Sequence, residues 1–200
     1  MLNKLLNNYK IILGSSSPRR RELLENLDIE FTVMPIKTDE KYPQNLAPTK
    51  VPEFLSQKKA RAYDGLLQPD WILITADTVV IVDNQIIGKP HTKDKAIEML
   101  KKLSAKAHLV ITGVTLRTIN HSKSFSCSTK VWFKELEPEE IEYYVEKYKP
   151  FDKAGAYGIQ EWIGYIGIQR IEGSYYNVVG LPVQKIYTEL KSFVKTLEQK

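Results

Sequence analysis

Short apolar runs separated by polar turns predict a series of β-strands along this chain. The runs are rich in Ile, Val, Leu, Thr and aromatic residues, and each is bounded by polar or turn-forming residues. Asp83-Asn84 and the segment 120–123 have the composition of hairpin connections. The expected strands are Ile11–Leu13, Phe31–Pro35, Trp71–Ala76, Thr78–Val82, Leu109–Ile119, Phe125–Lys134 and Ile163–Ile171.

Apolar positions spaced three and four residues apart predict helices between several of these strands. The expected helices are Pro18–Leu27, Pro52–Leu67, Lys93–Leu103, Pro138–Lys147 and Leu181–Leu197. Strands and helices alternate at first, and the chain then becomes rich in hairpins. This order predicts an α/β fold in which helices flank a mixed β-sheet, rather than an all-parallel sheet.

Composition narrows the class of protein. The 200 residues are 42% hydrophobic, with no evident repeat or long linker, so we expect a single domain over residues 1–200. One cysteine, Cys127, excludes an internal disulfide and a cysteine-based zinc site, and the three histidines lack metal spacing. No apolar run reaches membrane-spanning length and the N-terminal residues lack the apolar core of a signal peptide, which predicts a cytoplasmic protein with no membrane partner.

The net charge of +5 permits anionic ligands. The charges are mixed along the chain, however, and the basic arms of nucleic-acid-binding proteins are missing. We therefore expect a small anionic ligand and no nucleic acid.

The segment Ser15–Leu23 joins a strand to a helix and carries the most chemistry. Ser17 suits the N-cap and Pro18 the first helical position. Arginines follow at positions 19 to 21, where the helix dipole disfavours cations. An anion bound by the backbone N–H groups and the guanidinium groups would compensate. The alternative is a solvated basic helix start, and the glycines of a Walker loop are missing.

Asp77 is the second informative position. It interrupts the otherwise apolar run Trp71–Val82, where an ionised carboxylate is costly unless it is paired or bound to a cation. At the junction of two expected strands, its functional interpretations are a metal ligand and a general base. The alternative is an aspartate that caps a turn.

Lys59 shares the inward stripe of its predicted helix with Leu55, Ala62 and Leu66. Its neighbour Lys58 is expected to point outward as a solvated charge. Lys59 could serve a buried anionic site, or its stem could lie along the core edge with its ammonium in water.

Three further positions are candidates only in combination. Asp39-Glu40 lies in a polar loop and could hold a divalent cation or be surface. Lys89 follows a short hairpin, and taken alone it is a surface residue. Gln160 ends the glycine-rich segment 153–160 and has both a donor and an acceptor for a base edge. An enzyme that hydrolyses phosphoanhydrides needs cationic side chains to bind the phosphates, and carboxylates to bind a metal ion and to activate a water. This sequence contains both kinds of residue.

Together these segments resemble the Maf family of nucleoside triphosphate pyrophosphatases over nearly the whole chain. The resemblance implies an elongated mixed-sheet fold related to inosine triphosphatases, with two lobes around a central cleft. It also implies cleavage between the α- and β-phosphates, dependent on a divalent metal (Mg²⁺ or Mn²⁺), which yields a nucleoside monophosphate and pyrophosphate. The motifs are Ser15-x-Ser-Pro-Arg-Arg20, Asp39-Glu40, Lys59-Ala-Arg-Ala62, Ala76-Asp-Thr78, Gly88-Lys-Pro90, 152–160 and Gly180-Leu-Pro182.

The resemblance also implies a role for each matching residue. Asp77 corresponds to the proton acceptor, and Glu40 joins it as a metal-site carboxylate. The triphosphate-binding set corresponds to Ser15, Arg20, Lys59 and Lys89. The positions that sort substrates are Arg19, Thr78 and Gln160, and all three match the branch that hydrolyses dTTP and UTP rather than the 7-methyl-GTP branch.

Two positions depart from the family pattern. Gly14 stands where Ala is usual, and we expect no consequence. Glu161 stands where Gly commonly follows the glutamine, which leaves open the path of the loop after Gln160.

Other functions remain open on the sequence alone. A purine-directed, inosine triphosphatase-like enzyme is one alternative, and a non-enzymatic nucleotide-binding regulator of septum formation and cell division is another. The sequence leaves open whether the nucleotide is canonical or modified, which metal is used, and the oligomeric state, a homodimer included.

Overall fold

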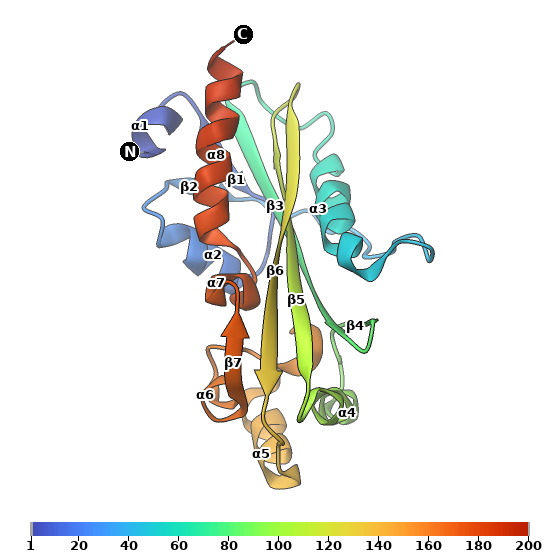
Figure 1. Ribbon diagram of the computed structural model, residues 1–200. Coiled ribbons are helices and arrows are strands. Elements are labelled where there is room, and N and C mark those ends of the chain that lie inside the picture. The colour runs from blue at the N-terminus through green and yellow to red at the C-terminus, as the bar shows by residue number, and fades with distance from the viewer. Residues whose placement is uncertain (1, 200) are drawn as a thin grey trace. The chain divides into compact units, whose positions relative to one another are not determined.

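The computed structural model describes residues 2–199, which form one mixed β-sheet flanked by helices (Figure 1). The strands are β1 (Lys10–Leu13), β2 (Phe31–Val33), β3 (Trp71–Val82), β4 (Gln85–Ile87), β5 (Ala107–Arg117), β6 (Ser122–Phe133) and β7 (Ile168–Glu172). The α-helices are α1 (Leu2–Leu6), α2 (Pro18–Glu25), α3 (Val51–Arg61), α4 (Lys93–Leu103), α5 (Pro138–Tyr148), α6 (Trp162–Gly167), α7 (Tyr175–Val179) and α8 (Val183–Glu198). Two short 3-10 helices, Pro48–Lys50 and Ala154–Ala156, complete the elements.

Hydrogen bonds order the sheet as β2-β1-β3-β5-β6-β7, with β4 paired to β3. β1 runs parallel to both β2 and β3, whereas the β3–β4 and β6–β7 pairs are antiparallel. The predicted α/β class with a mixed sheet is therefore confirmed. The predicted hairpin at Asp83-Asn84 is also confirmed, because both residues have positive φ (50° and 59°) between β3 and β4.

Two sequence predictions about strands are wrong. β3 runs unbroken through Asp77, which lies inside a strand rather than at the junction of two strands. The predicted strand Ile163–Ile171 begins instead as helix α6, and β7 starts only at Ile168. In a short apolar run, the spacing of hydrophobic residues does not distinguish a buried helix from a strand. Whether this run forms a helix or a strand therefore depends on how it packs in the folded protein.

Helix α3 is shorter than the apolar pattern predicts. It ends at Arg61, and Gly65 then adopts φ +79°. Leu55 is 3% exposed, as expected for the inward stripe, but Leu66 is 44% exposed and lies beyond the helix. The C-cap Ala62 is still αR, and Gly65 takes its positive φ three residues later, in the turn that follows the helix.

The chain forms two compact units, which are considered separately. The first unit comprises the residues up to Asp77, Thr112–Cys127 and the residues from Gly180 onward. Within it, α3 and α8 lie on opposite sides of the strands (Figure 1). Thr115 faces α3, where its hydroxyl lies 2.8 Å from that of Ser56, and Phe125 faces the α8 residue Lys185.

Close backbone contact positions α3 on the sheet of the first unit. A Cβ at Gly113 would lie 2.3 Å from the backbone nitrogen of Glu53, so only glycine allows the helix start to come this near. The hydroxyl of Thr75 donates to the Ser56 carbonyl at 2.8 Å. These contacts fix the helix that carries Lys59.

Gly14 also has a packing reason that the sequence did not reveal. A Cβ there would lie 2.8 Å from the hydroxyl of Tyr63 and from Cγ2 of Thr75. The buried Tyr63 uses that hydroxyl to donate to the carbonyl of Met34, where the loop after β2 begins. The glycine at this position therefore fits the packing of this structure, in which an alanine would crowd Tyr63.

The second unit comprises Thr78–Ile111 and Ser128–Val179. Its core includes Val110, Val131, Phe133, Tyr144 and Ile163, all at most 2% exposed. Among residues 2–199, no helix is both long enough and apolar enough to cross a membrane.

Candidate active site

The start of α2 has the local structure that its sequence predicts. The Ser17 hydroxyl accepts a hydrogen bond from the Arg20 amide at 3.5 Å, and Pro18 occupies the first turn. Ser15, 9% exposed, accepts from the Ser17 amide at 3.3 Å. The N-cap prediction is confirmed, and the Ser15 hydroxyl adds a hydrogen bond within the loop before the helix.

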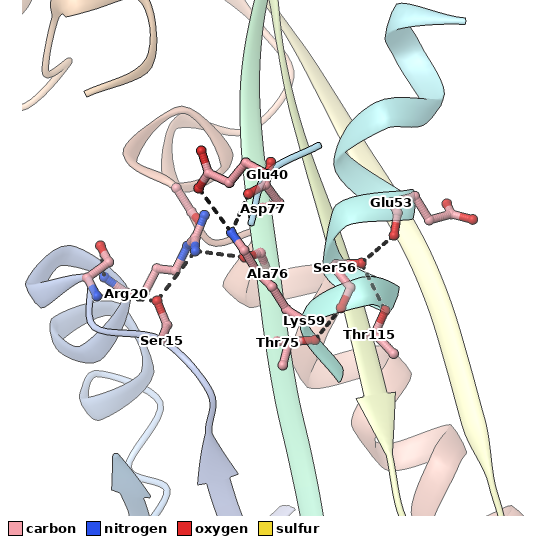
Figure 2. Close-up of polar contacts among 12 residues, drawn as sticks. Ser15, Arg20, Glu40, Glu53, Ser56, Lys59, Thr75, Ala76, Asp77 and Thr115 are labelled. Atoms are coloured by element: carbon pink, nitrogen blue, oxygen red, sulfur yellow. Dashed lines mark hydrogen bonds and ion pairs between the residues drawn. The ribbon is translucent and has the colours of Figure 1, made fainter. Parts of the chain in front are cut away.

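Arg20 ties this loop to the rest of the first unit (Figure 2). Its Nε donates to the Gly180 carbonyl at 2.9 Å, and its Nη1 donates to the Ala76 carbonyl at 2.8 Å and to the Ser15 hydroxyl at 3.4 Å. Burial lowers the pKa of the guanidinium, while the charges of Asp77 and Glu40 act in the opposite direction. Arginine remains protonated under such shifts. Arg20 therefore places a permanent positive charge directly beside the residue that precedes Asp77.

Lys59 brings two of the predicted carboxylates together (Figure 2). Its Nζ lies 2.5 Å from Oδ1 of Asp77 and 3.5 Å from Oε1 of Glu40. The side chains of Asp77, Lys59 and Glu40 are 8%, 18% and 48% exposed. Exposure to solvent therefore increases from Asp77 on the buried strand to Glu40 at the surface. The ammonium compensates a carboxylate that would otherwise be costly to bury.

Lys58 differs from its predicted role as a solvated charge. Its ammonium contacts Oδ1 of Asp39 and donates to the carbonyl of Lys41 at 3.0 Å, and its side chain is 31% exposed. Hydrogen bonds from Lys58 and from the Lys41 amide lower the pKa of Asp39. The two successive lysines of α3 thus both reach the segment that contains Glu40.

Of the remaining predicted site residues, Arg19 belongs to the first unit, and Thr78, Lys89 and Gln160 belong to the second. Thr78 is half-buried on β3, and Lys89 is exposed after β4, where the Gly88 carbonyl accepts from the Gly155 amide at 3.1 Å. Oε1 of Gln160 is buried without a hydrogen-bond partner among the described residues. An unsatisfied buried acceptor is costly, which makes Gln160 a candidate for binding a ligand donor.

Comparison with known families and proteins identifies the chain. The family model described as "Maf-like protein" matches residues 10–193. The chain belongs to the Maf-like family. Within the family it is 56% identical over 192 residues to the "dTTP/UTP pyrophosphatase" of Porphyromonas gingivalis (strain ATCC 33277), covering 94% of this chain and 96% of that protein. It is 52% identical over 187 residues to the protein of the same name from Bacteroides thetaiotaomicron, covering 93% and 97%.

The fold of this Maf-like chain is also found in a distant solved structure. The Staphylococcus aureus Ham1 protein matches with a TM-score of 0.54 and 14% sequence identity, covering 92% of this chain and 99% of that one. At this identity the likeness concerns the fold alone. It agrees with the mixed α/β architecture described above.

Glu161, where the chain departs from the Maf pattern, has a structural function. Its carboxylate accepts from the Tyr144 hydroxyl and lies 3.1 Å from Nζ of Lys153. The Tyr144 hydroxyl also accepts from the Gly158 amide at 3.0 Å. Glu161 therefore helps to hold the loop that ends at Gln160, just before α6.

Sequence reasoning missed the residues that anchor the site of this Maf-like chain. Lys58 and Tyr63 were indistinguishable from ordinary helix residues, although each binds the loop after β2. The Gly180 carbonyl was part of a noted motif, but nothing in the motif predicted that it would accept from Arg20. All three contacts join segments far apart in the sequence.

Proposed function

We propose that this Maf-like chain hydrolyses dTTP and UTP to the nucleoside monophosphate and pyrophosphate. The observation that carries the proposal is the ion pair of Lys59 with Asp77, which has Glu40 beside it, while Arg20 in the first turn of α2 binds the carbonyl of Ala76. Cations and carboxylates at one point suit a triphosphate and an attacking water. Relatives that are 52% and 56% identical carry the name dTTP/UTP pyrophosphatase.

Asp77 is proposed as the proton acceptor. Its carboxylate is held through Oδ1 by Lys59, so its orientation is fixed by a neighbour on α3. A carboxylate in a fixed place can take a proton from water as the water oxygen bonds to phosphorus and the bridging oxygen leaves with pyrophosphate. Ser15, Arg20, Lys59 and Lys89 are proposed to bind the triphosphate, each through a hydroxyl or a cation.

Glu40 and Asp77 would hold the divalent cation that the family resemblance implies. Both carboxylates lie within ion-pair distance of the same ammonium, so they converge on one place. Among residues 2–199 no cluster of three His, Cys, Asp or Glu side chains is arranged for a metal. One or two carboxylates plus substrate phosphates is a usual Mg²⁺ ligand set, so the residues present fit the ion. When bound, it would neutralise charge that develops on the phosphate oxygens.

Base selection is proposed for Arg19, Thr78 and Gln160. Uracil and thymine present two carbonyl acceptors that flank one N–H donor. The glutamine amide can pair with an adjacent carbonyl and N–H, and an arginine can donate to a carbonyl. The buried Oε1 of Gln160 supports this role, because a ligand N–H would satisfy it.

A product assay tests the proposal. Purified protein is incubated with Mg²⁺ or Mn²⁺ and each common triphosphate, 7-methyl-GTP, dITP and a modified uridine triphosphate, and the products are separated. We expect pyrophosphate and monophosphate, with kcat/KM highest for dTTP and UTP. Release of orthophosphate, or a clear preference for dITP or 7-methyl-GTP, would contradict the proposal. Nucleotide binding without turnover would favour the regulatory alternative.

A further inference from the structure

Glu40 lies at the centre of a three-residue turn that is closed by its neighbours. The Lys41 amide donates to Oδ1 of Asp39 at 2.9 Å, which bends the backbone around Glu40. Lys58 of α3 contacts the same Asp39 oxygen and donates to the Lys41 carbonyl at 3.0 Å. The ammonium of Lys58 therefore binds both residues that flank Glu40, Asp39 and Lys41.

These contacts of Lys58 are important because the turn lies in a segment without helix or strand. Residues 34–47 have no regular secondary structure, and Asp39, Glu40 and Lys41 are exposed. Such a segment has little packing to fix a side chain. The segment is held at its start by the hydroxyl of Tyr63, which donates to the Met34 carbonyl.

The sequence of α3 couples the turn to the site. Lys58 and Lys59 are consecutive, and Lys59 contacts both Asp77 and Glu40. One turn of a helix that is packed on the sheet thus sets the backbone of the Glu40 turn and also provides the cation that meets the Glu40 carboxylate. A shift of the turn relative to α3 would separate Glu40 from Lys59.

We infer that Lys58 is a positioning residue that holds the Asp39–Lys41 turn so that Glu40 faces Lys59 and Asp77. The inference rests on the proposed function, in which Glu40 takes part in substrate turnover. An exposed ion pair alone contributes little, and the Asp39 side chain is 58% exposed. The difference here is the additional hydrogen bond to the Lys41 backbone carbonyl, which closes the turn from outside and restrains its main chain.

A double-mutant cycle tests whether Lys58 acts through Glu40. We expect Lys58→Ala to lower kcat/KM for dTTP by about 5–30-fold, since loss of a charged hydrogen bond to the turn frees the Glu40 carboxylate. In a Glu40→Gln background the same substitution should change kcat/KM by less than about twofold. Arg61→Ala, an exposed cation of the same helix, is the matched control and should leave kcat/KM unchanged.

Hydrogen exchange of the Lys41 amide gives a readout independent of turnover. It should exchange faster in Lys58→Ala than in the wild type or in Arg61→Ala, while the amides of β3 keep their protection. Lys58→Arg, which can still donate to both partners, should restore the slow exchange and most of the activity.

The outcomes separate the two proposals. An equal loss from Lys58→Ala in both backgrounds, or unchanged exchange at Lys41, would overturn the inference while the hydrolase function stands. A wild-type protein that hydrolyses no triphosphate would overturn the proposed function, and the positioning role would fall with it.

Discussion

Nζ of Lys59 lies 2.5 Å from Oδ1 of Asp77, which joins helix α3 to the middle of strand β3. The pair explains how a charged residue persists in an otherwise apolar strand, since each charge compensates the other at a site where both are largely buried. It also holds the Asp77 carboxylate in one orientation, which suits the role of general base proposed for it.

Replacing Asp77 by Asn should nearly abolish turnover and leave the fold intact. The amide cannot accept the proton from water, and general-base loss costs about 10²–10⁴ in rate. Lys59 would still have Glu40 as an ion-pair partner. Steady-state kinetics and thermal unfolding of the purified variant check this expectation. A variant that keeps more than about a tenth of the wild-type rate would show that Asp77 is not the base.

Replacing Lys59 by Ala should lower kcat/KM for dTTP by roughly 10–100-fold, because it removes a charge-assisted contact worth about 1.5–3 kcal/mol. The matched control is Arg61→Ala, which removes an exposed cation from the last turn of the same helix. Kinetics of the two variants side by side make the measurement. Similar losses in both would mean that general helix charge matters rather than the Asp77 contact.

Replacing Gln160 by Glu should reduce kcat/KM for dTTP and UTP by roughly 5–100-fold, because mismatched buried polar groups cost about 1–3 kcal/mol each. A carboxylate cannot donate to a base carbonyl. Gln169→Glu adds the same charge at an exposed position of β7 and serves as the control. If the Gln160 variant keeps its preference for dTTP and UTP over dCTP, another residue selects the base.

Stability should fall in acid because of His108. This residue is 2% exposed, its Nε2 lies 2.8 Å from the Tyr157 hydroxyl, and burial lowers its pKa from 6.5 to about 4. Between these values the unfolded chain binds a proton that the folded protein does not, so stability is lost as the pH falls from 6.5 towards 4. The loss should reach about 2–3 kcal/mol near pH 4.5.

Urea unfolding near pH 7 and near pH 4.5 measures this loss. His108→Gln cannot titrate, so its stability should change less with pH than that of the wild type, whatever its stability near pH 7. Identical pH dependence of the two proteins would show that His108 does not carry the effect.

Replacing Gly113 by Ala should destabilise the protein by about 1–3 kcal/mol, the usual cost of overpacking. The added Cβ would meet backbone atoms of Pro52 and Glu53, so the start of α3 has to move. Gly88→Ala is the control, since a Cβ there meets no atom within 4 Å. Denaturant midpoints compare the two variants, and equal stability would mean that α3 adjusts without cost.

Several features could be predicted from the sequence because they depend on neighbouring residues. Ser17 and Pro18 start α2 through capping and a preset φ. Asp83 and Asn84 form the hairpin because both tolerate positive φ. The four-residue step from Leu55 to Lys59 places the ammonium on the inner side of α3, where it is 18% exposed.

Other features were decided only by the tertiary structure. The apolar run around Asp77 left open whether β3 is one strand or two, and the answer is one strand because Lys59 compensates the carboxylate. Nε and Nη1 of Arg20 donate hydrogen bonds to the carbonyls of Gly180 and Ala76, and no local sequence pattern predicts these contacts.

The same limit explains Lys58. The side chains of two adjacent lysines on a helix point about 100° apart around the helix axis. This spacing predicts that one lysine faces inward and the other faces outward. The outward lysine is nevertheless occupied, because the loop after β2 folds back to within reach of its ammonium. By itself, the sequence determined the α/β class, the start of α2, the turn between β3 and β4 and the set of charged residues, since these follow from local backbone and side-chain preferences. Which charges meet was decided by contacts between distant segments, and these exist only once the sheet and its helices have packed.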